Sequence, residues 1–273
     1  MSLNFPDTSG GWRALAARLA LVLLLTLVFV LLTGLVDGGV GVTAARLMSQ
    51  PRFPLANALP GLLLASVLLA WTRRALLSFG LTFAVEGLIY GVNRLKVANL
   101  GTPLLPDDFR MIGQLRKGGM HVLVGYLPHS PWPYLAMLVA LGLIILAWRL
   151  EPPLFPRRTR GGRLVAGSVL AVALISMLAG LSAWGKIYNA RVLWLEPWSA
   201  SVTSNHSGLI NSLMLFPLQY GSGHRKPDRA AAAQLIAQSS PALLKTMQQA
   251  DPAGELPDIV VVQSESLFDP AIM

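Results

Sequence analysis

A glutamate between two serines follows a short apolar run near the C-terminal end of the sequence, and this arrangement could bind a divalent metal. The apolar run is Ile259 to Val262, preceded by Pro257 and followed by Gln263-Ser264-Glu265-Ser266. A short β-branched run of this kind is typical of a strand buried on both faces of a parallel sheet. Ligands of open α/β sheets bind at the carboxyl ends of strands, and a carboxylate there suits Mg²⁺ or Mn²⁺. We predict that Glu265 is a metal ligand; the alternative is a solvated turn.

This strand needs neighbours, because its backbone groups must be paired. No second strand is predicted anywhere between residues 185 and 273. Either another chain completes the sheet, or residues 258–273 begin a domain that is incomplete here. We expect the second.

The composition indicates an integral membrane protein. The chain of 273 residues is 53% hydrophobic and only 13% charged, whereas soluble domains carry about 25% charged residues. The net charge of +9 could suggest nucleic acid as a partner. However, residues 1–185 hold 16 Lys and Arg against 6 Asp and Glu, while residues 186–273 hold 6 against 7. The basic excess therefore lies among the apolar runs, where it faces anionic lipid, and we expect no nucleic-acid partner.

Five apolar runs are long enough to cross about 30 Å of hydrocarbon as helices. They cover approximately residues 19–36, 53–71, 75–92, 132–150 and 164–184. The first is too long for the apolar core of a signal peptide, so we interpret it as an uncleaved anchor. The predicted membrane domain therefore covers residues 1–185.

Arginine placement predicts the orientation of these spans. A short loop between the fourth and fifth runs contains Arg157, Arg158, Arg160 and Arg163, and such clusters favour the cytoplasmic side. The N-terminus is then cytoplasmic, and everything after Trp184 is extracytoplasmic.

The third run contains a polar stripe. Glu86, Tyr90, Asn93 and Arg94 share one face of a helix at this spacing. A carboxylate inside a span costs about 2.5–3.5 kcal/mol on insertion scales, so it is expected to have a partner or a task. We predict either a path for a lipid headgroup or, as the alternative, an inter-helix hydrogen bond or a Glu86–Arg94 contact through Tyr90.

The loop at residues 93–131 is long and basic, and it contains a helix start. Pro106-Asp107-Asp108 places proline and acidic residues where the first turn of a helix favours them. Arg116 and Lys117 follow on the polar face of a predicted amphipathic helix. They could hold a lipid phosphate, or the helix could be an ordinary solvated one.

Residues 186–257 form a predicted helical linker at the membrane surface. Leu209 to Tyr220 is apolar with few charges, and we expect a surface-lying helix that ends at Pro217. Shorter helices are expected at residues 227–238 and 241–250. The fold class is therefore mainly α: five transmembrane helices, a helical linker, and the first strand of a truncated α/β domain.

Residues 257–270 resemble the opening of the catalytic domain of the lipoteichoic acid synthase family. That family belongs to the sulfatase/alkaline-phosphatase superfamily and includes bacterial phosphoglycerol transferases. The matching text is Pro257-Asp258-Ile259-Val260-Val261-Val262-Gln263-Ser264-Glu265-Ser266-Leu267-Phe268-Asp269-Pro270. Five spans before a linker are also similar to that family, as is the loop text Asn93-Arg94-Leu95-Lys96 followed by Pro103-Leu104-Leu105-Pro106-Asp107-Asp108.

The resemblance implies a metal-dependent transferase in the bacterial inner membrane. Its glutamate ligates Mn²⁺ or Mg²⁺, and this role carries over to Glu265. A threonine nucleophile would move glycerol phosphate from phosphatidylglycerol to an envelope polymer or glycan. In the family this threonine and the further Asp and His ligands follow the glutamate by tens of residues, so no catalytic nucleophile is assigned here. We expect residues 1–273 alone to be inactive.

Two alternatives stay open. On the same scaffold, the enzyme could be a phosphoethanolamine transferase or a sulfatase-like hydrolase. In a different class, the chain could be a non-enzymatic scaffold or transporter subunit. Against the latter stand the isolated strand and an odd number of spans, which does not divide into two matching repeats.

Overall fold

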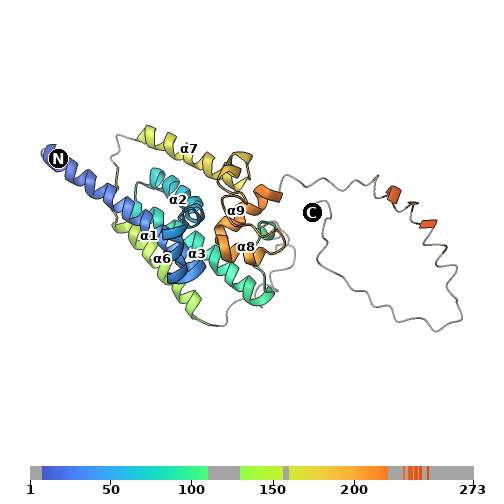
Figure 1. Cartoon of the computed structure of the whole chain (residues 1–273). Helices are drawn as coiled ribbons and strands as arrows, with labels where there is room; N and C mark the ends of the chain where they lie inside the picture. Colours follow the sequence, from blue (N-terminus) through green and yellow to red (C-terminus); the bar gives the residue numbers. More distant parts are fainter. Residues whose placement is uncertain are drawn as a thin grey trace. The chain divides into compact units, whose positions relative to one another are not determined.

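Helices make up every secondary-structure element in the described part of the chain (Figure 1). The computed structural model describes residues 8–109, 130–155 and 160–220, and a few residues between 230 and 245. The chain divides into two compact units, Met1–Gly223 and His224–Met273, and the named helices all belong to the first. They are α1 (Thr8–Ser49), α2 (Arg52–Thr72), α3 (Ala75–Leu100), α6 (Trp132–Leu150), α7 (Arg160–Leu178), the 3₁₀ helix η3 (Ser182–Lys186), α8 (Ala200–Ser207) and α9 (Leu209–Tyr220).

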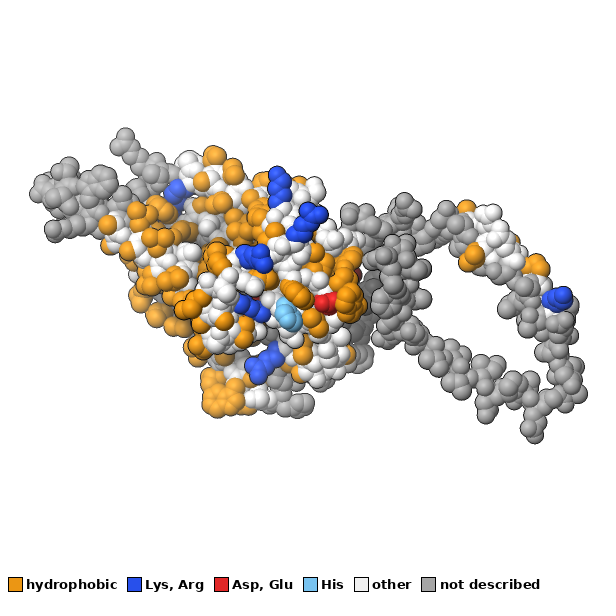
Figure 2. Space-filling model, in the orientation of Figure 1, with side chains coloured by type: hydrophobic (Ala, Val, Ile, Leu, Met, Phe, Trp, Pro, Cys, Tyr) orange, Lys and Arg blue, Asp and Glu red, His pale blue; other side chains and the backbone are white. Residues whose placement is uncertain are grey.

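Five of these helices, α1, α2, α3, α6 and α7, are long and apolar enough to span a membrane. This confirms the mainly α fold with five spans. Figure 2 shows hydrophobic side chains over much of the visible face, with Lys and Arg in separate patches. Trp132 and Trp148 of α6 are 72% and 62% exposed, and the helical rise places them about 24 Å apart. That spacing suits tryptophans at the two faces of a bilayer. The predicted strand and Glu265 lie outside the described residues.

Several span boundaries differ from the sequence prediction; the third span, predicted to end at Val92, continues in α3 to Leu100. The first span was predicted to end at Val36, and the helix that contains it breaks close to that point, at Gly39, whose φ is 70° and ψ −178°, so that α1 comprises two helical segments. Glycine adopts this conformation at little cost, so the helix resumes after the break. The fifth span was predicted to reach Trp184, but α7 ends at Leu178, and Gly180 with φ 70° then turns the chain.

Helix α2 lies at the centre of the bundle and packs against α1, α3 and α7. Small residues allow the close approach. A Cβ on Gly61 would lie 2.3 Å from the Phe29 ring of α1, and a Cβ on Gly167 of α7 would lie 2.6 Å from the indole nitrogen of Trp71. Packing through small residues is the usual means of association between helices in lipid.

Pro60 interrupts the hydrogen-bond ladder of α2, and Tyr188 repairs it. Proline has no N–H, so the carbonyl of Ala56, four residues earlier, loses its helical donor. The Tyr188 hydroxyl donates to that carbonyl at 2.8 Å. Burial raises the pKa of Tyr188 above its usual range, so the hydroxyl keeps its proton and remains a donor.

The two ends of the bundle are built differently. At one end, which we call the turn end, Glu151 follows α6 and accepts hydrogen bonds from the backbone N–H groups of Leu76 and Leu77, both at 2.9 Å. This carboxylate satisfies the first turn of α3. At the opposite end, which we call the linker end, η3, α8 and α9 follow α7 (Figure 1).

Helix α9 is packed into the linker end rather than lying on a surface, and this corrects the sequence prediction. It runs to Tyr220 with Pro217 inside it. It contacts α2, α8 and η3. The buried side chains are Leu209, Ile210, Asn211, Ser212, Leu213 and Leu215. The linker predicted to begin at residue 186 is therefore held against the spans as far as α9.

Candidate functional site

A buried amide joins three structural elements at the linker end. Asn57 of α2 is 2% exposed. Its Nδ2 donates to Asp37 Oδ2 of α1 at 2.7 Å and to the Tyr90 hydroxyl of α3 at 3.1 Å. Its Oδ1 accepts from the backbone N–H of Asn211 in α9 at 3.0 Å. One side chain therefore fixes two other spans and the linker helix relative to α2.

Asp37 satisfies the first residue of α9 across the fold. Its Oδ1 accepts from the backbone N–H of Leu209 at 3.1 Å. The first N–H groups of a helix have no partner within the helix, and a negative group is favoured at that end. The preceding Gly208 has φ 100°, and a Cβ there would lie 2.6 Å from both Asp37 Oδ2 and Asn57 Oδ1. Only glycine allows this approach.

Glu86, the first residue of the predicted polar stripe, is buried, and one of its carboxylate oxygens has no hydrogen-bond partner in the described part of the chain. Its side chain is 6% exposed, and Oε1 has no donor within reach among the described residues. A Cβ added to Gly61 would lie 2.3 Å from this oxygen, so the carboxyl group occupies the space that the glycine leaves. Buried polar atoms without a partner are rare and costly in folded proteins.

The other residues of the stripe differ from one another in their contacts. Tyr90 joins Asn57 in the buried cluster. Asn93 Oδ1 accepts from the backbone N–H of Leu104 at 2.7 Å. Arg94 is exposed, and no direct ion pair joins it to Glu86 in the described part of the chain. The structure thus brings Tyr90, but not the whole stripe, to the polar cluster.

The loop after α3 is held by a capped helix start. Residues 106–109 are helical, and Asp108 Oδ2 accepts from the Leu105 N–H at 2.6 Å. The same oxygen pairs with Lys96 Nζ at 2.6 Å. The acid in the third helical position thus reaches back to the cap residue, with Pro106 in the first position. The predicted lipid-contacting Arg116 and Lys117 lie outside the described residues.

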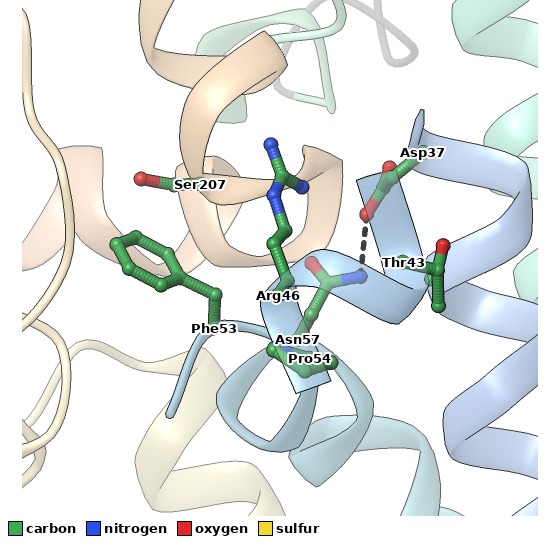
Figure 3. A pocket seen from close by; sticks show the side chains of 8 residues that line it. Asp37, Thr43, Arg46, Phe53, Pro54, Asn57 and Ser207 are labelled. Atoms are coloured by element: carbon green, nitrogen blue, oxygen red, sulfur yellow. Dashed lines mark hydrogen bonds between the residues drawn. The ribbon is translucent and has the colours of Figure 1, made fainter. Parts of the chain in front are cut away.

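A pocket opens beside the Asp37–Asn57 hydrogen bond (Figure 3). The pocket is small, with room for about one water molecule. Figure 3 shows the Arg46 side chain between Asp37 on one side and Phe53 and Ser207 on the other. The lining residues come from α1, α2 and α8: Gly34, Asp37, Thr43, Arg46, Phe53, Pro54, Asn57 and Ser207.

The sequence analysis did not select Asp37, Asn57 or Arg46. A usable signal existed for the first two, because polar residues in or beside apolar runs are expected to be functional or paired. Asp37 follows the first run directly, and Asn57 lies within the second. Arg46 carried no such signal, because its place at the pocket depends on α1 continuing beyond Gly39.

The metal prediction rests on Glu265 alone. Within the described ranges, no three His, Asp or Glu side chains lie close enough together to hold a metal ion. The described polar cluster of Asp37 and Asn57 binds the start of helix α9 through hydrogen bonds. Both residues also line the pocket.

Comparisons with protein-family models, curated proteins and solved structures gave no match for this chain. Its function is therefore argued from its own residues.

Proposed function

We propose that the chain is the membrane part of a bacterial metal-dependent phosphoglycerol transferase. In this proposal glycerol phosphate moves from phosphatidylglycerol to an envelope polymer or glycan. The observation that carries the proposal is the sequence Pro257 to Pro270, with Glu265 directly after an apolar run. The five membrane-length helices before it agree with the anchor expected for such an enzyme.

Glu265 is the proposed ligand of Mn²⁺ or Mg²⁺, and a carboxylate oxygen is the donor that these hard cations prefer. When bound, the metal would supply Lewis-acid activation and charge stabilisation. In this proposal the described residues form the membrane anchor of the enzyme. They hold the start of the linker against the spans through Asp37 and Asn57.

The proposed orientation places the N-terminus in the cytoplasm of a bacterial cell and the linker end outside its inner membrane. The Arg160 and Arg163 end of α7 belongs to the turn end, where Arg163 donates to the Ala70 carbonyl at 2.8 Å. Basic residues are retained on the cytoplasmic side. The linker then leaves α7 on the side where phosphatidylglycerol and the acceptor polymer would meet.

The test is lipid turnover by the protein produced from its own chromosomal locus. Membranes from these cells receive phosphatidylglycerol labelled in its acyl chains, with Mn²⁺, and labelled diacylglycerol is measured. We expect diacylglycerol release that is abolished by Glu265→Gln. The control Glu255→Gln removes a carboxylate from the same segment but outside the motif, and should leave release unchanged.

Two outcomes would contradict the proposal. Membranes that release no more diacylglycerol than those of a deletion strain would exclude phosphoglycerol transfer. Full activity in the Glu265→Gln protein would exclude the metal role of this residue. A parallel reaction with phosphatidylethanolamine separates the two transferase alternatives, because only a phosphoethanolamine transferase would release diacylglycerol from that lipid.

A further inference from the structure

Arginines from three parts of the chain meet at the turn end of the bundle. Two of them form the turn between α2 and α3, one lies in the last turn of α6, and one lies near the start of α7. They are Arg73, Arg74, Arg149 and Arg163. We call this set the arginine cluster.

Backbone carbonyls of neighbouring helices hold two of these side chains in place. The Arg74 guanidinium donates to the carbonyl of Trp148 in α6, which directly precedes Arg149. Arg163 Nη1 donates to the carbonyl of Ala70 in α2 at 2.8 Å. The turn between α2 and α3 is therefore joined to α6 on one side, and the end of α2 is joined to α7 on the other.

The charge of the arginine cluster is not neutralised by the acidic residue beside it. Both carboxylate oxygens of Glu151 accept hydrogen bonds from backbone N–H groups of α3 at 2.9 Å. No acidic side chain forms an ion pair with Arg73, Arg74 or Arg149 in the described part of the chain. Arg73 and Arg74 are half-buried, and a partly buried charge favours a counter-ion. The cluster is therefore suited to an anion from outside the chain.

Arg73 occupies a backbone conformation that favours glycine. Its φ is 65° and its ψ is 15°, and it is the one residue other than glycine with a positive φ among the described residues. Glycine is the usual residue at such a helix end, because a side chain there is strained. Strained residues collect at functional positions. The strain at Arg73 thus indicates a use for its guanidinium group.

Exposed apolar side chains surround the arginine cluster. Trp71 of α2, Leu76 of α3, Leu150 of α6 and Val165 of α7 are all exposed, and they lie at the ends of helices long enough to span a membrane. In a bilayer, such side chains lie where acyl chains meet headgroups. A partner that fits this surface has an anionic group for the arginines and acyl chains for the apolar rim.

We propose that the arginine cluster binds the phosphate groups of anionic phospholipids in the leaflet at the turn end. The guanidinium groups hold phosphate oxygens with their planar fork, and basic residues beside a span attract an anionic lipid surface. Recognition depends on the charge of the lipid. Phosphatidylserine should therefore bind as phosphatidylglycerol does, and zwitterionic phosphatidylcholine should bind more weakly. The proposal does not depend on the proposed function, in which phosphatidylserine has no part.

The test is retention of phosphatidylserine by the purified 273-residue chain. The protein is kept in detergent, phosphatidylserine or phosphatidylcholine is added, and bound lipid is counted by native mass spectrometry. We expect Arg73→Gly to weaken retention of phosphatidylserine about fivefold, the contribution of one arginine near an anionic surface. Because glycine relieves the strain at this position, the same variant should melt at the wild-type temperature or higher.

A second variant and a control accompany Arg73→Gly. Arg149→Gln removes an exposed side chain, so it should not disturb packing, and it should weaken retention by a similar factor. The matched control is Arg52→Gln, which removes an exposed arginine beside Phe53 at the opposite end of α2 and should leave retention unchanged. Inorganic phosphate in excess should not displace the lipid, because it lacks acyl chains.

The proposal is overturned by any of four results. These are equal retention of the two lipids by the wild type, wild-type retention in the folded variants of Arg73 and Arg149, an equal loss in Arg52→Gln, and displacement of the lipid by inorganic phosphate. Failure of the proposed function gives a different pattern. In that case retention of phosphatidylserine depends on the arginine cluster, but cell membranes release no diacylglycerol.

Discussion

The carboxyl group of Asp37 accepts a hydrogen bond from the backbone N–H of Leu209, at 3.1 Å and across 172 positions of sequence. Asp37 belongs to the first membrane span, and Leu209 is the first residue of the linker helix α9. Asn57 adds a second contact two residues further along α9, to the N–H of Asn211. The start of α9 is thus capped by the spans themselves.

Removing this cap should loosen α9 without unfolding the spans. We expect Asp37→Ala to lower the free energy of unfolding by about 1–3 kcal/mol, because a helix cap is lost and a buried donor is left unsatisfied. Hydrogen exchange followed by mass spectrometry should become faster at residues 209–215.

The matched control for this variant is Ser199→Ala. Ser199 Oγ accepts from the Val202 N–H at 3.2 Å and caps the neighbouring helix α8. Its loss should speed exchange in α8 while α9 stays protected. Unchanged exchange of α9 in Asp37→Ala would mean that its apolar face alone holds it.

Gly208 should be far less tolerant of substitution than Gly101, although both have positive φ. Gly101 has φ 70° and open space around the position of a Cβ, whereas a Cβ on Gly208 would lie 2.6 Å from Asp37 and Asn57. Gly101→Ala should cost about 1 kcal/mol through backbone strain. Gly208→Ala adds overpacking of about 1–3 kcal/mol, and should reproduce the faster α9 exchange of Asp37→Ala. Equal melting temperatures for the two alanine variants would contradict this.

Tyr188 and Pro60 should be coupled energetically, because both act on the Ala56 carbonyl. In the wild type, Tyr188→Phe removes the donor to that carbonyl and should cost about 1–3 kcal/mol. In a Pro60→Ala background, the new N–H at position 60 can bond the same carbonyl, so Tyr188→Phe should cost less. A double-mutant cycle on thermal unfolding in detergent measures this difference. Additive costs would show that the carbonyl does not need the tyrosine.

The spans were predictable from sequence, because long apolar runs in lipid can only be helices. The run at residues 132–150 matches α6 at both ends. The course of α1 beyond Val36 was not predictable in this way, since Asp37 and the glycines that follow end the apolar run, yet a second helical segment follows the break at Gly39. The position of Arg46 depends on this continuation.

The contacts of the polar cluster could not be predicted from the sequence for a different reason. Asp37 and Leu209 are distant in sequence, and Leu209 contributes only a backbone N–H, which no residue pattern reveals. The stripe at Glu86 and Tyr90 was visible from its spacing, but spacing could not tell that Tyr90 meets Asn57 of another helix, while Glu86 Oε1 meets no donor among the described residues. Periodicity identifies a helix face, whereas partners on other helices depend on packing.

Substitution of Glu86 is expected to affect stability and function in opposite directions. Its Oε1 has no hydrogen-bond partner among the described residues, so the side chain contributes no polar contact there that a variant would lose. Replacing a buried, unpaired carboxyl group by a neutral one removes a burial cost. We therefore expect Glu86→Gln to melt at the same temperature as the wild type or higher.

Function should respond in the opposite direction if Glu86 lies on the path of a lipid headgroup. Residues that reduce stability are retained where activity needs them. We expect Glu86→Gln to lower diacylglycerol release in the membrane assay, while Glu196→Gln, which changes a half-buried carboxylate in the linker segment, leaves release unchanged. Unchanged turnover in a stable Glu86→Gln protein would remove the headgroup path and leave Glu86 as a packing residue over Gly61.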